Sequence, residues 1–426
     1  MRGAPAAVAE IPHPRKLLGD GQFVESEHWY ACGPPPPATQ GWKLYVPLTL
    51  LNAAETLARL SPPLIRAGTH FKYIKTIKLL RKLNAGSFGY TQIGKGVVIY
   101  LVEPDARLID RLKEALAPFR GQTPAVPCAR PFGADLPLYY RYGSYRGDLL
   151  ELGTTKTQDN RYDAGAAVPE GVTDALAAYA TPVPEPEEVR AFLLRYPVFE
   201  ALVQQGKCGV FLALDFASEE FRQVVLKVGY YRGQVQPDGT DGCDFLRREL
   251  VFYRRLRARG LADVAPALVD AFDAPRKVIL ALEHLPGTTL LVKKLQGELT
   301  VEHLERCWAT MERVHRAGLY LGDAKIANFI ADDGGDVHVL DFEAAGVLGE
   351  EPPAIRTFFL HPEPEDPRRA DQAHFLASVL YPYESGRYSW EDRHVDVQDL
   401  LALKLDTAVA DWALQKLRAV LLDASP

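Results

Sequence analysis

The segment LGDAKIANFIADDGGDVHVLDFEAA, residues 321–345, decides how the C-terminal half of this 426-residue chain is interpreted. Asp323 is followed five residues later by Asn328, and Asp341 comes thirteen residues after Asn328. Two apolar runs between Asn328 and Asp341 flank the polar turn DDGGD, a pattern that is typical of a β-hairpin. The sequence therefore predicts a hairpin with an amide side chain at one end and a carboxylate at the other.

The three polar side chains of this segment match the chemistry of phosphoryl transfer from ATP. One carboxylate must accept the proton of the attacking hydroxyl, while an amide oxygen and a second carboxylate must hold Mg²⁺ against the triphosphate. The pattern Asp-x-x-x-x-Asn followed by Asp is typical of the catalytic loop and the metal-binding aspartate of kinases. We therefore predict Asp323 as a catalytic residue, Asn328 and Asp341 as Mg²⁺ ligands, and ATP as a cofactor.

Upstream segments supply the other parts of an ATP site in the order that a kinase requires. QVVLKVG is a predicted strand whose lysine would hold the α and β phosphates, and CDFLRRELVFYRRL is a predicted helix whose glutamate could pair with that lysine. GKCGVF stands where a phosphate-covering loop belongs, although it is poorer in glycine than G-x-G-x-x-G. VILALEHLPG fits a strand that runs into a hinge whose backbone would read adenine. The predicted ATP-binding residues are Gly206, Lys207, Gly209, Lys227, Glu249, Glu283 and Leu285.

Two details of the kinase pattern leave alternatives open. Leu321 and Gly322 stand where many protein kinases have His-Arg, which is typical of the aminoglycoside-kinase-like branch and leaves the phosphate acceptor undecided. Asp371 is placed either to brace the catalytic loop from a helix or to serve as a helix N-cap.

Composition places the chain among ordinary globular proteins. A formal net charge of −6 gives no reason to expect a nucleic-acid partner. The sequence has no apolar run long enough to cross a bilayer and no signal-peptide core, so we expect a cytoplasmic protein without a membrane partner. The five cysteines are widely spaced and include no C-x-x-C pair, which argues against a disulfide framework or a structural zinc site.

Two proline-rich segments divide the chain. CGPPPP, residues 32–37, leads from an N-terminal arm into the first strand, and ATPVPEPEE, residues 180–188, cannot hold a helix or a central strand. Strand-rich sequence precedes helical sequence, which predicts an α+β fold. The predicted parts are an arm (1–28), a first domain (29–180), a linker (181–188) and a kinase-like domain (189–426) with lobes at about 189–285 and 286–426.

The first domain carries two pairs of polar residues at the spacing of a strand face. In GWKLYV, residues 41–46, Lys43 and Tyr45 share one face, so that Trp42, Leu44 and Val46 pack the other face as core. In THFKYIK, His70 and Lys72 form a similar pair. Lysines that converge with a histidine would have a depressed pKa through like-charge repulsion and desolvation, which is the condition for a lysine general base. We expect the nearby Lys75, Lys78, Arg81 and Lys82 to form a solvated basic face.

The sequence GWKLYVPLTLLNAAETLARLSPPLIRAGTHFKYIKTIKLLRKLNAGSFGYTQIGKGVVIYLVEPD, residues 41–105, resembles the N-terminal lyase domain of class III and IV lanthipeptide synthetases. VPCARPFG and LYYRYGSY also resemble that domain, and the resemblance runs on through the kinase pattern. The lyase domain is similar to the phosphothreonine lyases of bacterial pathogens, which implies a lyase-like α+β domain followed by a bilobal protein-kinase-like domain. The family continues with a zinc-dependent cyclase, which we expect to be absent here, as in synthetases of thioamitide-type pathways.

The resemblance implies a two-step dehydration of a ribosomally made precursor peptide. The kinase would phosphorylate Ser or Thr, and the lyase would expel phosphate to leave dehydroalanine or dehydrobutyrine, with no metal in the lyase site. Lys72 would take the α-proton and Lys43 would stabilise the enolate-like charge. The implied phosphate-binding residues are Lys95, Arg130 and Arg141, with Thr91 and Gln92 as further donors and a structural ion pair as the alternative for the two arginines.

The sequence departs from the family pattern at Tyr45. The family has Lys-x-His, whose histidine is the general acid for the leaving phosphate, whereas this chain has Lys-x-Tyr. A phenol is a weaker acid than imidazolium, although neighbouring lysines would lower its pKa. Three alternatives follow: Tyr45 donates the proton, His70 donates it, or the lyase is slow or inactive.

The sequence therefore predicts a bifunctional peptide dehydratase that does not cyclise its product. Its partners would be a precursor peptide with a leader and a separate cyclase or decarboxylase, and it would be a monomer or a homodimer. One alternative is a peptide kinase whose first domain only binds phosphopeptide. Another is a small-molecule phosphotransferase of the aminoglycoside type.

Overall fold

The computed structural model describes residues 8–19, 21–147, 149–152, 155–159, 167–332, 334–350, 358–361, 363–382, 393–402 and 407–422. The chain divides into two compact units. The first comprises Met1–Phe211, Val228–Asp244 and Ala274–Val278, and the second comprises Leu212–Lys227, Phe245–Asp273 and Ile279–Pro426. The predicted linker, residues 181–188, lies inside the first unit and not at a boundary between the two units. The predicted domain bounds therefore stay a prediction.

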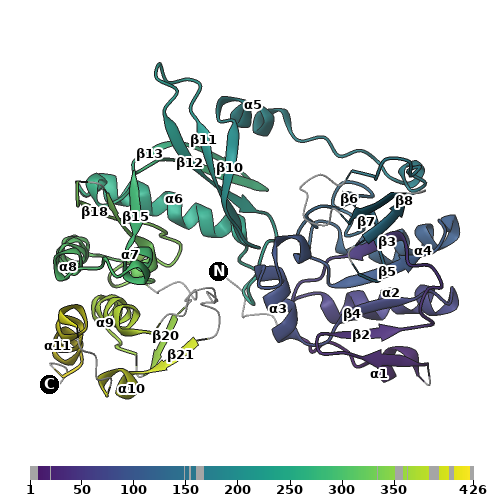
Figure 1. Cartoon of the computed structure of the whole chain (residues 1–426), viewed down its shortest axis with the longest axis horizontal. Helices are drawn as coiled ribbons and strands as arrows, with labels where there is room; N and C mark the ends of the chain where they lie inside the picture. Colours follow the sequence, from purple (N-terminus) through teal and green to yellow (C-terminus); the bar gives the residue numbers. More distant parts are fainter. Residues whose placement is uncertain are drawn as a thin grey trace. The chain divides into compact units, whose positions relative to one another are not determined.

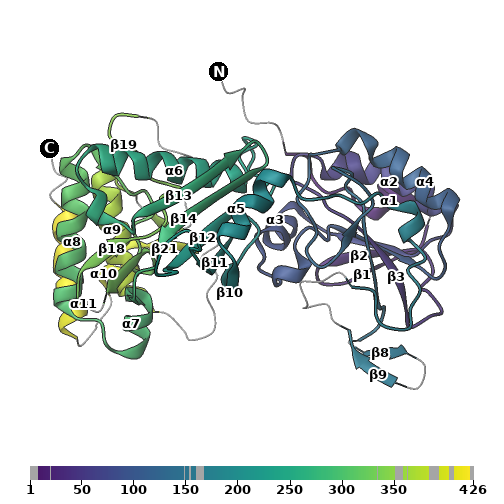
Figure 2. The same ribbon diagram turned by 90° about the horizontal axis from the view of Figure 1, so that it is seen from above.

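The first unit is built around a seven-stranded sheet with the order β1-β2-β4-β5-β3-β7-β6 (Figure 1). Every pairing in this sheet is antiparallel. Figure 2 shows α1, α2 and α4 gathered on one side of the sheet. The elements are α1 (Pro14–Leu18), β1 (Phe23–Glu25), β2 (Trp29–Cys32), β3 (Gln40–Val46), α2 (Ala53–Arg66), β4 (Phe71–Ile74), α3 (Ile77–Ala85), β5 (Val97–Leu101), α4 (Ala106–Leu116), β6 (Arg130–Pro131) and β7 (Tyr139–Ser144).

The two faces of this sheet have different environments. Leu44 of β3 belongs to the main core, together with Leu57 of α2 and Leu112 of α4. Tyr45 packs on the opposite face in a small cluster with Val98. The alternation follows from the two-residue period of a strand. It confirms that Trp42, Leu44 and Val46 face the core.

The chain continues into a five-stranded sheet with the order β10-β11-β12-β14-β13. The predicted helix around Glu249 is present as α6, and its apolar residues at helical spacing, such as Phe245 and Leu256, are buried. The elements of this region are β8 (Leu149–Leu152), β9 (Thr155–Gln158), α5 (Glu187–Arg195), β10 (Val198–Gln204), β11 (Cys208–Leu214), β12 (Gln223–Tyr230), α6 (Gly242–Ala258), β13 (Leu268–Ala274) and β14 (Lys277–Glu283).

The second unit ends in a mainly helical region. The predicted hairpin is confirmed, because β17 pairs antiparallel with β18 and Phe329 lies opposite Val339. The elements are β15 (Gly287–Thr289), α7 (Leu290–Gln296), α8 (Val301–Arg316), β16 (Leu319–Tyr320), β17 (Phe329–Asp332), β18 (Val337–Val339), β19 (Gly346–Val347), β20 (Phe358–His361), α9 (Pro367–Leu380), β21 (Arg393–Asp396), α10 (Val397–Leu401) and α11 (Ala408–Leu422).

This mixed architecture with several antiparallel sheets confirms the predicted α+β class. Within the described parts of the chain, each helix is too short or too polar to span a lipid bilayer.

Candidate active sites

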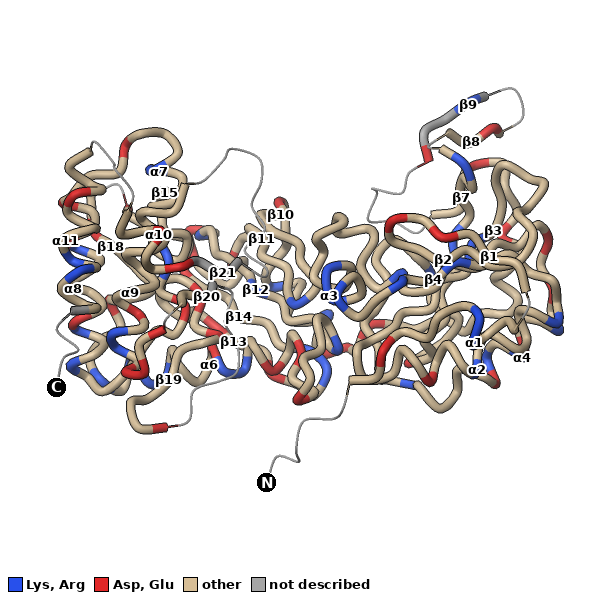
Figure 3. Tube along the Cα trace, turned by 90° about the horizontal axis from the view of Figure 1, so that it is seen from below, with Lys and Arg blue, Asp and Glu red and all other residues tan. Residues whose placement is uncertain are grey.

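Strand register brings residues that are distant in the sequence onto one face of the first sheet. Lys43 of β3 lies opposite Arg141 of β7. In the next row, Tyr45 of β3 and Lys72 of β4 both lie opposite Val98 of β5. Figure 3 shows basic positions on these neighbouring strands. Residues that face each other on adjacent strands have Cβ atoms about 5 Å apart, so these side chains can meet one ligand.

A cavity of about 240 Å³ lies on this face of the sheet, and we call it the basic cavity. Six residues of the predicted lyase site line it: Lys43, Tyr45, Lys72, Gln92, Lys95 and Arg141. The other lining residues are Trp29, Val98, Tyr100, Ser144, Tyr145, Gly147 and Asp159. Because four lining side chains are cationic and one is acidic, the basic cavity favours an anionic ligand.

Aromatic rings hold two of the ammonium groups at the cavity wall. The Lys72 Nζ lies 4.7 Å from the ring centroid of Trp29. The Lys95 Nζ lies 4.7 Å from the ring centroid of Tyr45. A cation over an aromatic face is attracted by the ring quadrupole. These contacts help to fix both lysines beside the space that a ligand would occupy.

Asp159 is a functional candidate that sequence reasoning missed. Its side chain is fully buried, and its Oδ1 lies 2.5 Å from the Arg141 Nη2. Its Oδ2 accepts a hydrogen bond from the Ser144 backbone N–H at 3.0 Å. An added Cβ on Gly143 would lie 2.9 Å from this Oδ2 and 3.5 Å from the Lys43 Nζ. Because Asp159 follows β9 in a stretch without a recognisable motif, only the folded chain reveals its place.

Tyr45 has the opposite pKa shift from the one that the sequence suggested. Burial raises the pKa of its phenol, and the nearby charge of Asp159 raises it further, while Arg141 opposes both effects. The expected lowering by lysines is therefore wrong, because desolvation of the phenolate is the larger effect. Tyr45 consequently stays protonated at neutral pH and can donate a hydrogen bond to an anion.

Three predicted lyase residues lie outside the lining of the basic cavity. His70 faces another cavity, and its Nδ1 lies 3.1 Å from the Gly33 carbonyl oxygen. Arg130 forms an ion pair with Asp174, which matches the structural alternative to phosphate binding for this arginine. Thr91 is buried, and its hydroxyl oxygen lies 3.4 Å from the amide nitrogen of Gln92. The roles of these three residues stay predictions.

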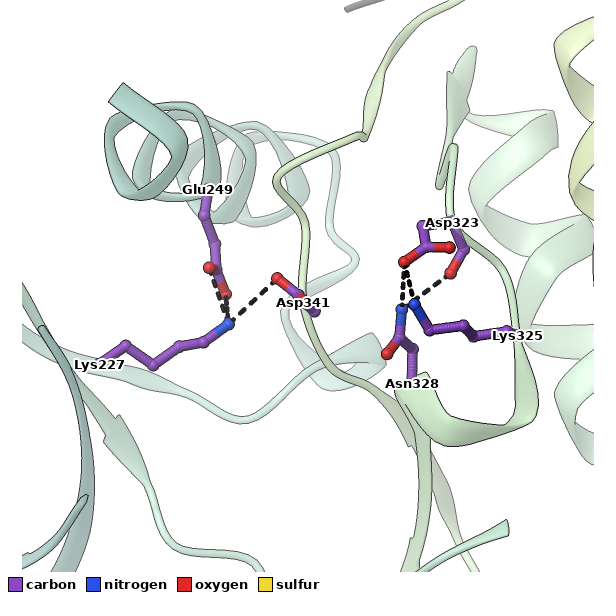
Figure 4. A network of polar contacts seen from close by, with 6 residues as sticks. All are labelled: Lys227, Glu249, Asp323, Lys325, Asn328 and Asp341. Atoms are coloured by element: carbon purple, nitrogen blue, oxygen red, sulfur yellow. Dashed lines mark hydrogen bonds and ion pairs between the residues drawn. The ribbon is translucent and has the colours of Figure 1, made fainter. Parts of the chain in front are cut away.

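The second unit contains the predicted lysine–glutamate pair (Figure 4). The Lys227 Nζ lies 2.7 Å from Glu249 Oε1 and 2.8 Å from Oε2. The same Nζ lies 3.3 Å from Asp341 Oδ1. Burial and the charge of Asp341 raise the pKa of Glu249, while Lys227 opposes that shift. Asp341 has a backbone φ of 66°, an unusual conformation that fits a constrained functional aspartate.

The residues of the predicted catalytic loop lie together beside this pair (Figure 4). Asp323 Oδ2 lies 2.5 Å from the Lys325 Nζ and accepts a hydrogen bond from the Asn328 amide at 3.1 Å. Asp371 is buried in α9 and accepts hydrogen bonds from the Leu321 and Gly322 backbone N–H groups, each at 2.7 Å. This geometry confirms that Asp371 braces the loop. Lys325 was not predicted, although its place two residues after Asp323 could have drawn attention to it.

The glycine-containing turn at residues 205–208 has different surroundings from those expected of a phosphate-covering loop. The Gly206 N–H donates to the Ala85 carbonyl oxygen at 3.0 Å. A Cβ on Gly206 would lie 1.5 Å from the Asn84 carbonyl oxygen, so this turn packs tightly on the end of α3. The Lys207 carbonyl oxygen accepts a hydrogen bond from the Tyr230 N–H at 3.0 Å. A phosphate role for Gly206, Lys207 and Gly209 stays a prediction that these contacts do not support.

The predicted adenine hinge falls between two strands. β14 ends at Glu283, and β15 begins at Gly287, so Leu285 lies in the connection. The Glu283 N–H donates to the Ala267 carbonyl oxygen at 2.8 Å. The placement is consistent with a hinge, and adenine recognition stays a prediction.

The lysine–glutamate pair, the Asp-x-x-x-x-Asn loop and Asp341 together match the arrangement expected of a kinase-type site. The family model described as RamC, N-terminal domain, matches residues 13–189. The chain is 29% identical to a probable SapB synthase of Streptomyces coelicolor, over 77% of this chain and 38% of that protein. It is therefore distantly similar to that synthase over most of its length, and it spans about two fifths of the relative.

Shorter similarities connect the chain to protein kinases. It is 28% identical to the hormonally up-regulated neu tumor-associated kinase homolog B of Xenopus laevis, over 25% of this chain and 18% of that protein. The human kinase of the same name is 27% identical over 25% of this chain and 16% of its own length. The chain thus contains a kinase-type region, for which ATP is the implied nucleotide.

Proposed function

We propose that this chain phosphorylates Ser or Thr of a precursor peptide with ATP and then eliminates phosphate to leave a dehydroamino acid. The observation that carries the proposal is the basic cavity, whose lining includes Lys43, Lys72, Lys95 and Arg141. The same chain also has a kinase-type site. Similarity to SapB synthase supports a ribosomally made peptide as substrate. The two sites account for dehydration, and we assign ring formation to neither.

In the first step, Asp323 would accept the proton of the peptide hydroxyl while Lys227 holds the phosphates of ATP. Asn328 and Asp341 supply the oxygen donors that Mg²⁺ prefers. The Asn328 Nδ2 donates to Asp323, which leaves its amide oxygen directed away from that carboxylate (Figure 4). These residues therefore fit a magnesium ion, which when bound would neutralise the charge of the triphosphate.

In the second step, Lys72 would take the α-proton of the phosphorylated residue. The electrons of that C–H bond form the C=C double bond, and the C–O bond breaks as phosphate leaves with its electron pair. Lys43 would stabilise the charge that develops on the neighbouring carbonyl oxygen, and Arg141 with Lys95 would hold the phosphate. Tyr45, which burial keeps protonated, would donate a proton to the leaving oxygen.

The experiment that tests the whole sequence uses purified protein, ATP, Mg²⁺ and a Ser/Thr-containing precursor peptide. Mass spectrometry should find a product one water lighter for each modified residue. A product that carries phosphate and goes no further would contradict the elimination step. Unchanged peptide would contradict the kinase step.

A second candidate is a peptide kinase whose first unit binds phosphopeptide without eliminating phosphate. The ion pair between Arg141 and Asp159 favours this candidate, because Asp159 offsets the arginine charge that would stabilise the departing phosphate. The three lysines of the basic cavity remain to bind the phosphate group. The raised pKa of Tyr45 also makes it a weaker acid than the imidazolium that the family pattern contains. Phosphopeptide supplied without ATP separates a lyase from such a binding domain.

A further inference from the structure

A second and larger cavity lies at the β1 edge of the first sheet. It has a volume of about 680 Å³, and we call it the flanking cavity. Its lining combines small and apolar groups with two basic side chains and includes Arg15, Val24, Ala31, Gly33, Pro34 and His70. The proposed reaction assigns no role to this cavity.

The flanking cavity continues the face that carries the basic cavity. Val24 lies opposite Ala31, and Ala31 lies opposite Lys72, so the three side chains share one row. Ala31 lines the flanking cavity and Lys72 lines the basic cavity. A second contact also connects the two cavities. His70 lines the flanking cavity, Tyr100 lines the basic cavity, and their ring centroids are 5.2 Å apart.

We propose that the flanking cavity binds an apolar side chain of the phosphopeptide close to the residue that undergoes elimination. This inference rests on the proposed function, because it assumes that the basic cavity receives the phosphorylated residue. Its occupant is a peptide because the two cavities lie along one row of side chains that crosses β4, β2 and β1. A chain that enters the basic cavity can therefore continue across these strands into the flanking cavity. Val24 is 70% exposed there and offers an apolar surface to that chain.

Strand geometry fixes how far the apolar residue lies from the reacting one. Lys72 and Val24 are separated by two strand spacings, which is about 10 Å. An extended peptide advances about 3.3 Å per residue. The side chain that occupies the flanking cavity is therefore about three positions away from the phosphorylated residue, on one side of it.

The test measures binding, so that it does not depend on elimination. Fluorescently labelled peptides carry the phosphonate analogue of phosphothreonine, in which a methylene group replaces the bridging oxygen so that phosphate cannot be eliminated. They are glycine-rich except for one leucine, which is placed at each position from three before to three after the phosphonate residue. Their dissociation constants are measured by anisotropy with the full chain and without ATP. A leucine at two or three positions on one side should tighten binding about tenfold over glycine, as burial of one apolar side chain predicts.

Two exposed apolar residues of the same unit give a matched pair of variants. Val24→Asp places a charge in the flanking cavity, whereas Ile65→Asp changes a residue of α2 that is 43% exposed and lies outside both cavities. Val24→Asp should abolish the tenfold preference for leucine, and Ile65→Asp should retain it. Val24→Ser serves as a milder variant if thermal unfolding shows that Val24→Asp is unstable.

Equal affinities for all peptides in the wild-type protein would overturn the proposal, and so would a leucine preference that survives both Val24 variants. Absence of phosphopeptide binding would overturn it as well. The wild-type protein could prefer leucine, lose this preference in Val24→Asp, and yet release no phosphate from a phosphothreonine peptide. That result would support the proposed role of the flanking cavity and contradict the lyase function. The two proposals can therefore fail separately.

Discussion

The kinase-type site and the basic cavity are assembled in different ways. The catalytic loop of the kinase-type site is local in sequence, since Asp323, Lys325 and Asn328 fall within six residues and contact one another directly. The basic cavity is dispersed, since its lining runs from Trp29 to Asp159 and depends on the register of several strands. A site whose residues are close in the sequence forms a motif that can be recognised without a structure. The residues of a dispersed site can be identified only when the strand pairing is known.

The variant Asp341→Asn should separate the activities of the two sites most clearly. This change removes the charge of the carboxylate that lies 3.3 Å from the Lys227 Nζ and that we propose as a magnesium ligand. Phosphorylation of the peptide should fall by about a thousandfold or more, while elimination from supplied phosphopeptide should persist. The control is Asp336→Asn, because Asp336 is an exposed acid in the β17–β18 turn. Phosphate transfer from labelled ATP gives the measurement.

Lys72→Ala should have the converse effect. Without the proposed base, elimination should fall by about a hundredfold to ten-thousandfold, and phosphorylated peptide should accumulate when ATP is supplied. Lys78→Ala is the matched control, since Lys78 is an exposed lysine of α3. If the Lys72 variant dehydrates the peptide at the wild-type rate in the mass-spectrometric assay, the assignment of the base is wrong.

The pair Tyr45→Phe and His70→Gln decides which residue donates the proton. Tyr45 lines the basic cavity, whereas His70 contacts Gly33 and lines the flanking cavity. Tyr45→Phe should slow elimination about a hundredfold, and His70→Gln should change the turnover number by less than about threefold. Release of phosphate from a phosphopeptide measures both rates. The reverse order of effects would identify His70 as the acid.

Asp159→Asn should give the smallest effect of the series. Loss of the ion pair that holds Arg141 should slow elimination about tenfold. Because the charge of Asp159 raises the pKa of Tyr45, its removal should lower that pKa. If protonated Tyr45 is required, activity is lost as pH rises through this pKa, so the alkaline limb of the pH–rate profile should move to lower pH. If the alkaline limb of the pH–rate profile does not move, the effect of Asp159 on elimination does not depend on the pKa of Tyr45.

What could be predicted from the sequence follows the same division. The hairpin and the Lys227–Glu249 pair were predictable because fixed spacings and apolar periodicity describe them. For Asp371 the sequence left two roles open, and its hydrogen bonds to the loop decide between them. The alternation of Lys43 and Tyr45 with buried core residues was predictable from the two-residue period of a strand. These features depend on short stretches of chain.

The rest depends on contacts between distant segments. Asp159 could not be found, because its relevance arises from contact with Arg141 and Ser144. The direction of the Tyr45 pKa shift was missed, because the degree of burial is a property of the packed cavity. The position of the glycine turn in a kinase pattern suggests a phosphate role, whereas its packing on Asn84 and Ala85 appears only when the chain is folded.

The central claim is that the basic cavity eliminates phosphate from a peptide. The most direct test supplies the purified protein with a synthetic phosphothreonine peptide in the absence of ATP. Release of inorganic phosphate together with a dehydrobutyrine-containing product, which depends on Lys72, is the predicted result. Tight binding of the intact phosphopeptide with no release of phosphate would contradict the claim and leave a kinase with a phosphopeptide-binding domain.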